Sequence, residues 1–341
     1  MKRIALLPCL LLLSGMLVCT AADLSWIDEP YKKYSHDDFF ASVGESDSKE
    51  EAELKAVESL ASIFGQDVES ESEAESKMRQ ASIAELGTSY ESSKTLNQKI
   101  QRFVNQDDLI GIEIAESYYD KKRKRYYALA VMDKNVAFSI YETILRNNDK
   151  KARSFLKLVE EDNYSLLSYS NILKAKNLSK INENYYSRVT VLNPNKAEKL
   201  KNSLLKTSEL TPKILEIASK TKIAVNIEND PSNEIKLAFS KVLSDLGFIV
   251  TKEKARYVLS GNAFFEEREI KGKEIVNIDY KIQTVIKDTS NTDEMVSWNV
   301  SGKEGSKTAE YAKQKAIASL IKKITNDYPQ YFNETIGGIN D

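Results

Sequence analysis

Few residues of this chain belong to the types that usually carry catalysis. The 341 residues include one histidine and two cysteines. Histidine is the usual proton shuttle and metal ligand because its pKa lies near neutrality. His36 stands beside Asp37 and Asp38 in KKYSHDDFF, but neighbouring residues of an extended segment point to opposite faces and do not converge on a metal. We therefore interpret His36 as part of a polar lead-in to a strand, and we expect no metal and no other cofactor.

The remaining residues show no pattern for phosphate binding or acid–base catalysis. The glycines lack the spacing of a phosphate-binding loop and read as strand or turn positions. Glu266 and Glu267 are paired carboxylates, the residue type that glycosidases use, but they stand in a charged strand. The sequence therefore predicts a protein without enzymatic activity and without an evident small-molecule substrate.

Both cysteines, Cys9 and Cys19, lie in an amino-terminal segment with the layout of a secretory signal. Two basic residues precede an apolar run over 4–18, and small residues follow at 20–22. The run is shorter than the roughly 20 apolar residues that span a membrane. Residues 1–22 are therefore predicted to be a signal peptide. Cleavage after Ala22 leaves a chain without cysteine, and hence without disulfides or thiol chemistry.

Cys19 is also a candidate site of lipidation. Met16-Leu17-Val18 precede it in the place of a bacterial lipobox, although Val18 is larger than the small residue that this motif favours. Two outcomes stay open. Lipid on Cys19 predicts a membrane-attached protein, and plain cleavage after Ala22 predicts a free periplasmic or secreted one.

The most conspicuous charge cluster is basic and lies between two pairs of tyrosines. It consists of Lys121, Lys122, Arg123, Lys124 and Arg125. Such a cluster beside aromatic rings is suited to anionic lipid headgroups, lipopolysaccharide phosphate or a nucleic acid backbone. The alternative is a solvated hairpin tip whose tyrosines pair across the strands. We favour the solvated tip, and we expect no nucleic-acid partner, because 51 acidic residues outnumber 49 basic ones.

The segments around this cluster predict a small α+β domain over 23–135. FFASVGES (39–46) reads as a strand in which Gly44 permits a turn, and Ser46 or Ser48 is suited to cap the helix that follows. Alternating strands over 109–119 and 125–132 predict a hairpin with the basic cluster at its tip. The polar tract 68–82 leaves strand, surface helix and loop open, whereas 94–104 reads as helical.

Two further segments follow this first domain. Apolar stripes at helical spacing over 136–219, without a strict heptad repeat, predict an antiparallel bundle or long hairpin of helices. Within this segment, Thr211-Pro212 reads as a cap followed by proline at the first position of a helix. Over 220–336, a strand, a helix, four strands and a closing helix predict a second two-layer sandwich. Trp298 lies on an alternating strand and is expected in its core rather than on a glycan-binding surface.

A short helical motif occurs in both predicted sandwiches. AELKAVESL (52–60) and AKQKAIASL (312–320) share two alanines, a lysine, a serine and a leucine at the same spacing. The alanines let a sheet approach one helix face closely, and the leucine fills the wider space beyond them. We therefore expect an α+β protein with two small helix-on-sheet sandwich domains joined by a helical middle segment.

Several of these segments occur in the order of a known family. The segment around Trp26, FFASVGES, the alanine-rich helix and YYALAVMD together resemble the LPP-twenty-like family of small bacterial envelope lipoproteins over 25–133. KIAVNIE, LSDLGFIV and ARYVLSGNAFFEE resemble strand–helix–strand modules of curli secretion lipoproteins, flagellar assembly protein T and the amino-terminal domain of TolB.

These resemblances imply an exported protein, periplasmic or associated with the outer membrane, without enzymatic activity. Its expected role is structural or in assembly, through contacts with other envelope proteins. The alternative is a binding module for an anionic envelope component such as lipopolysaccharide, phospholipid or peptidoglycan.

Overall fold

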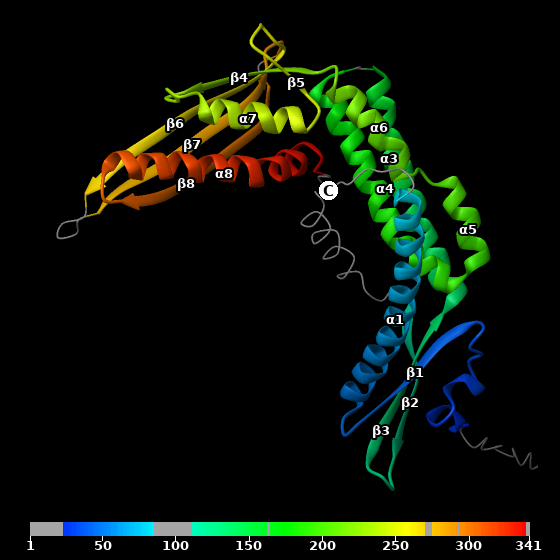
Figure 1. Ribbon diagram of the computed structural model, residues 1–341. Helices are drawn as coiled ribbons and strands as arrows, with labels where there is room; N and C mark the ends of the chain where they lie inside the picture. The colour runs from blue at the N-terminus through cyan, green and yellow to red at the C-terminus, as the bar shows by residue number, and fades with distance from the viewer. Residues whose placement is uncertain (1–22, 85–110, 162–163, 270–274, 292, 339–341) are drawn as a thin grey trace, which may run out of the picture. The chain divides into compact units, whose positions relative to one another are not determined.

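The computed structural model describes residues 23–84, 111–161, 164–269, 275–291 and 293–338 (Figure 1). Two compact units divide the chain: Met1–Leu60 with Ile112–Asp133, and Ala61–Gly111 with Lys134–Asp341. Each unit combines helices with a β-sheet, so the predicted α+β class is confirmed. The division into four segments along the chain stays a prediction.

The first unit is built on a three-stranded antiparallel sheet. Its strands are β1 (Phe39–Ser46), β2 (Ile112–Asp120) and β3 (Arg125–Asp133), in the order β1-β3-β2. The central strand is buried from Tyr127 to Met132, as its run of apolar residues requires. The predicted strand over 39–46 and the predicted hairpin are therefore confirmed.

One face of this sheet is covered by the amino-terminal segment. Two short 3₁₀ helices, η1 (Ser25–Ile27) and η2 (Pro30–Lys32), precede β1. The indole of Trp26, which is only 1% exposed, belongs to a cluster with Leu129 and Val131 of β3. Aromatic side chains of this segment thus seal a face that is otherwise apolar.

The other face packs against the start of α1 (Lys49–Ala84), on which Ala52, Ala56 and Leu60 are fully buried. Gly44 lies inside β1 and not in a turn, which corrects its predicted role. A β-carbon there would overlap the backbone of Ala52 and Ala56, so Gly44 is what lets α1 approach the strand. Ser48 caps the helix as predicted, because its Oγ accepts from the Glu51 amide at 3.2 Å.

The helix α1 also settles one open alternative. Its backbone continues to Ala84, so the polar tract 68–82 is helical. The predicted helix over 94–104 lies outside the described residues.

After β3, the second unit continues with four helices: α3 (Lys134–Glu161), α4 (Leu166–Leu192), α5 (Pro194–Ser203) and α6 (Thr207–Ala218). Asn193 separates α4 from α5, and its side chain accepts from the Lys196 amide at 3.0 Å. The predicted start of a helix at Thr211-Pro212 is wrong. The helix begins one turn earlier at Thr207, whose amide donates to Glu183 of α4, and Pro212 lies inside it.

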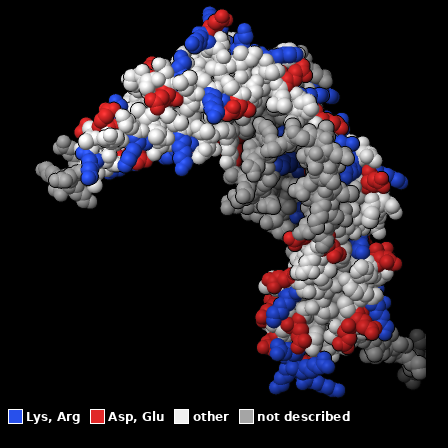
Figure 2. Space-filling model, viewed as in Figure 1, with Lys and Arg blue, Asp and Glu red and all other residues white. Residues whose placement is uncertain are grey.

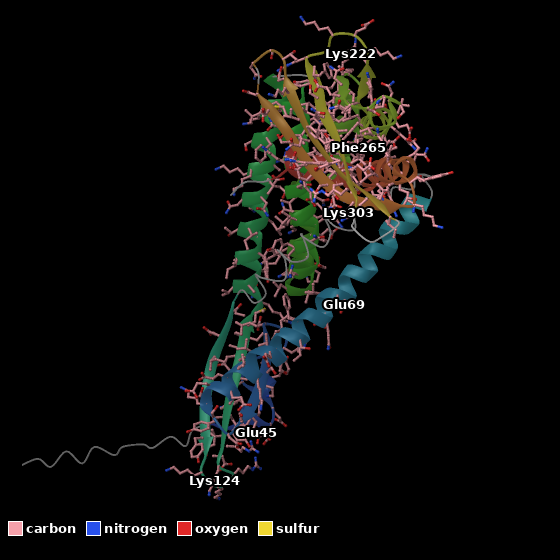
Figure 3. All side chains as sticks on the ribbon, turned by 90° about the vertical axis from the view of Figure 1, so that its left-hand side faces the viewer. Glu45, Glu69, Lys124, Lys222, Phe265 and Lys303 are labelled. Atoms are coloured by element: carbon pink, nitrogen blue, oxygen red, sulfur yellow. The ribbon has the colours of Figure 1, made fainter. Side chains whose placement is uncertain are left out.

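A five-stranded sheet of order β5-β4-β6-β7-β8 completes the second unit. Its strands are β4 (Lys222–Glu228), β5 (Ile249–Thr251), β6 (Tyr257–Glu269), β7 (Val276–Asp288) and β8 (Glu294–Ser306). Figure 1 shows α7 (Glu234–Asp245) and α8 (Ala309–Ile336) along one face of this sheet. Figure 3 marks Lys222, Phe265 and Lys303 on three of its strands.

The core of the second unit joins the helices to the sheet. Tyr169 of α4 packs against Phe248 and Phe332, with ring centroids 4.8 and 6.1 Å away. Trp298 is 6% exposed and lies 5.2 Å from the ring of Tyr328, so its expected place in the core is confirmed. Burial raises the pKa of Tyr328.

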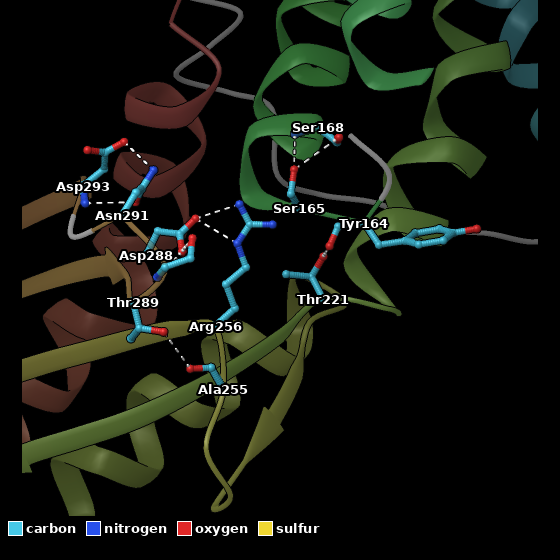
Figure 4. Close-up of polar contacts among 11 residues, drawn as sticks. Tyr164, Ser165, Ser168, Thr221, Ala255, Arg256, Asp288, Thr289, Asn291 and Asp293 are labelled. Carbon is cyan, nitrogen blue, oxygen red and sulfur yellow. Dashed lines mark hydrogen bonds and ion pairs between the residues drawn. The ribbon is translucent and has the colours of Figure 1, made fainter. Parts of the chain in front are cut away.

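An ion pair between the exposed side chain of Arg256 and the buried Asp288 lies at the β7–β8 turn (Figure 4). Arg256 donates to Asp288 at 2.9 Å, and Asp288 also accepts from the amide and hydroxyl of Ser290 at 2.9 and 2.6 Å. Burial alone would raise the pKa of Asp288, but the bonds from Arg256 and Ser290 lower it. This network ties a turn together, and we assign it a structural role.

Candidate anionic-surface site

The first four residues of the basic cluster, Lys121 to Lys124, form the turn between β2 and β3, and Arg125 begins β3. Asp120 Oδ1 accepts from the backbone amides of Lys122 at 2.8 Å and Arg123 at 3.1 Å. The amide of Arg123 is the main cause that lowers the pKa of Asp120, with the Lys122 amide and nearby charges adding to it. Lys124 has the left-handed φ of 54° that such a turn requires. The carboxylate of Asp120 therefore organises the turn.

The two arginines of the cluster are held by other side chains. Arg123 donates to the hydroxyl of Tyr127 at 3.4 Å. Arg125 pairs with Asp47 at 2.7 Å and with Glu45 at 3.6 Å; Glu45 lies in β1, and Asp47 follows the end of that strand. These contacts reduce the charge that the arginines offer to a partner.

Three of the four exposed cations of the cluster are lysines, namely Lys121, Lys122 and Lys124, called here the tip lysines. Within the part of the chain that the structure describes, no ion pair joins them to an acid. Figure 2 shows the basic side chains gathered at this turn, and Figure 3 marks Lys124 there. The turn thus presents three lysines at one point of the surface.

The tyrosines beside the turn pair across the strands, as predicted. Tyr119 stands opposite Tyr126 with ring centroids 4.6 Å apart, and Tyr118 stands opposite Tyr127. Tyr119 is 40% exposed, whereas Tyr127 is buried in the cluster around Trp26. The rings support the hairpin and leave one aromatic side chain open to solvent beside the tip lysines.

The residues considered for catalysis do not assemble into a site. The ring of His36 packs against Tyr31, with centroids 4.9 Å apart. Glu266 and Glu267 are neighbours on β6 and point to opposite faces of its sheet. Among the described residues, no group of three His, Cys, Asp or Glu side chains is placed to hold a metal ion.

Neither Cys9 nor Cys19 falls within the described residues. None of the helices that the structure describes combines the length and apolar character needed to cross a membrane. Sequence reasoning found all five cations but missed the acids that hold Arg125. Glu45 and Asp47 come about 80 residues earlier in the chain, and only the β1–β3 register brings them close.

The fold defines an α+β protein in which helices pack on sheets, with an exposed basic turn between β2 and β3. Residues 25–133 match the model of the LPP20 lipoprotein family, so the predicted resemblance is confirmed over that segment. The match supports an exported protein of the lipoprotein type, associated with the cell envelope. No curated protein matches the chain.

Solved structures with partial similarity to this chain include two lipoproteins and a secreted protein. A minor lipoprotein from Acinetobacter baumannii is 14% identical and covers 34% of this chain and 90% of its own, with a TM-score of 0.26. A secreted protein from Helicobacter pylori is 12% identical over 89% of this chain and 99% of its own, with a TM-score of 0.37. A lipoprotein from Neisseria meningitidis is 15% identical over 31% and 99%, with a TM-score of 0.23. Scores this low support no conclusion about function.

Proposed function

We propose that this chain is an exported envelope lipoprotein with a structural or assembly role, acting through protein contacts and without catalysis. The observation that carries the proposal is the LPP20 match over 25–133, which begins just after the predicted signal peptide. Lipid on Cys19 then holds the protein at a membrane of the envelope, which we propose to be the outer membrane on its periplasmic side.

The absence of catalysis in this proposal is supported by the residues themselves. The single histidine packs against aromatic rings, and the paired glutamates of β6 diverge. General acid–base catalysis requires groups that converge on one reacting atom.

The role is tested by chemical cross-linking in intact cells, followed by isolation of envelope fractions. We expect the protein in the outer-membrane fraction and in cross-linked complexes with other envelope proteins. A variant with Ala in place of Cys19 should leave the membrane fraction if the lipid is the anchor. Recovery of the unaltered protein only as a soluble monomer would contradict the proposal.

The tip lysines favour a second candidate function, binding of an anionic envelope component. Three exposed lysines without an ion pair among the described residues, next to the exposed ring of Tyr119, suit a phosphate-bearing surface. Each basic residue near an anionic membrane contributes about 1 kcal/mol, so three contribute about a hundredfold in affinity.

This candidate is tested with vesicles that contain an anionic phospholipid. Replacing the tip lysines by serine should weaken vesicle binding by about a hundredfold. A matched control replaces Lys150, Lys151 and Lys157, which are exposed on α3, and removes the same charge. Equal binding by both triple variants would show that the tip is not a lipid-binding site.

A further inference from the structure

The repeated helical motif places a lysine on the edge of a sheet in both units. Lys55 of α1 donates to the carbonyl of Glu45 in β1 at 3.4 Å, and Lys315 of α8 donates to the carbonyl of Gly305 in β8 at 3.3 Å. In each case the acceptor lies ten residues earlier in the chain. Both strands are edge strands, so the same residue of the motif closes one position on each edge.

Further side chains of α8 extend this protection along β8. Lys323 donates to the carbonyl of Ser301 at 2.8 Å, and Tyr331 donates to the carbonyl of Ser297 at 2.5 Å. The donors are eight residues apart on the helix and the acceptors four apart on the strand. Eight residues of helix and four of strand both rise about 12–13 Å, which keeps helix and strand in register.

The edge of β1 has a second contact, and the two remaining edge strands, β2 and β5, differ in length. On β1, the hydroxyl of Tyr31 accepts from the outward amide of Ala41 at 3.3 Å, which adds to the contact of Lys55. At the far edge of the second sheet, β5 has only three residues, and such a short edge offers little to a partner strand. The nine-residue edge strand β2 is therefore the remaining case.

The outward groups of β2 follow from the register. Ala41 and Glu45 of β1 bond outward, so the alternate residues of β1 bond to β3. The intervening residues of β3 must then bond to β2. The β2 residues left pointing outward are Ile112, Ile114, Ser117 and Tyr119.

No hydrogen bond from the described part of the chain reaches the backbone of these four residues on the outer side of β2. Their side chains all lie on the face that packs against α1, and Ser117 donates to Glu53 of that helix at 3.0 Å. Among the described residues, the edge of β2 is thus a row of backbone donors and acceptors without a partner, and the side chains beside it are two isoleucines, a serine and a tyrosine.

We propose that the β2 edge pairs with β2 of a second copy of this chain, antiparallel, to form a six-stranded sheet across a two-fold axis. With the axis at the bulge between Ile114 and Glu116, Ile112 stands opposite Tyr119 and Ile114 stands opposite Ser117. A β-branched residue opposite an aromatic ring is a favourable cross-strand pair. No two like charges stand directly opposite each other.

Charge also selects the antiparallel arrangement. Parallel pairing would place the tip lysines of both copies side by side, whereas antiparallel pairing places the two tips at opposite ends of the joined sheet. This inference deepens the proposed structural role by naming its surface and its partner.

Sedimentation of the purified mature chain tests the pairing. We expect a dimer for the unaltered chain and a monomer for Ser117→Lys, because a lysine on an edge strand opposes pairing. Ser301→Lys is the matched control: Ser301 is also an exposed serine on an edge strand, but the carbonyl of Ser301 is already held by Lys323. Circular dichroism of each variant verifies that the fold is retained.

Three results would overturn the inference: a monomeric unaltered chain, a dimeric Ser117→Lys variant, or loss of the dimer in Ser301→Lys. A monomer would contradict strand pairing and leave export and envelope attachment untouched, because those are measured separately on the protein from cells.

Discussion

At the scale of single residues, Gly44 fixes the distance between α1 and the first sheet. Gly44→Ala should lower the free energy of unfolding by about 3 kcal/mol, since the added carbon overlaps the backbone of Ala52 and Ala56. Gly65→Ala is the control, because nothing lies within 4 Å of its added carbon and the position is helical. We expect that variant to gain up to about 1 kcal/mol in urea unfolding. Equal effects of both substitutions would contradict the close approach.

The lowered pKa of Asp288 should make the free energy of unfolding depend on pH. Its pKa is lowered in the folded chain, so its contribution is present above the unfolded pKa of 3.8 and is lost as the pH falls through the folded pKa. Asp288→Asn should therefore lower the free energy of unfolding by about 2 kcal/mol at pH 7, because it weakens the charge-assisted bond from Arg256. Urea unfolding of both proteins from pH 7 to pH 3 measures this. A difference that stays constant below pH 4 would argue against the ion pair.

At the scale of elements, the two copies of the helical motif stabilise different sheets. Leu60 and Leu320 are both fully buried, so Leu60→Ala and Leu320→Ala should each lower the free energy of unfolding by about 2–5 kcal/mol. Amide hydrogen exchange measures the two units separately. Leu60→Ala should speed exchange in the sheet of β1, β2 and β3, and Leu320→Ala should speed exchange in the sheet of β4 to β8. Leu54→Ala is the control because Leu54 is 56% exposed. Equal loosening of both sheets by either leucine variant would refute this assignment.

Sequence patterns predicted elements better than they predicted contacts between elements. The strand over 39–46 is predicted to the residue, because alternation and local turn signals define it. The helix start at 211 was wrong because tertiary contacts of Thr207 outweigh the local proline signal. The role of Gly44 and the acids that hold Arg125 depend on strand register, which no local pattern contains.

At the scale of the whole molecule, two helix-on-sheet units follow residues 1–22, which we propose to be a leader that directs export. The two sheets close most of their long edges with side chains of the helix that follows the edge strand. In the described part of the first unit, we propose one basic turn and the edge of β2 as surfaces for partners. Both lie within residues 25–133, the segment that matches the LPP20 lipoprotein family.

The central claim is that this chain works as an exported lipoprotein of the envelope, and the intact mass of the protein from cell membranes tests it most directly. We predict a chain that begins at Cys19 and carries the added mass of acyl groups. A chain that begins at residue 23 without lipid would retain export but contradict membrane attachment through Cys19. A full-length chain that begins at Met1 would contradict export itself.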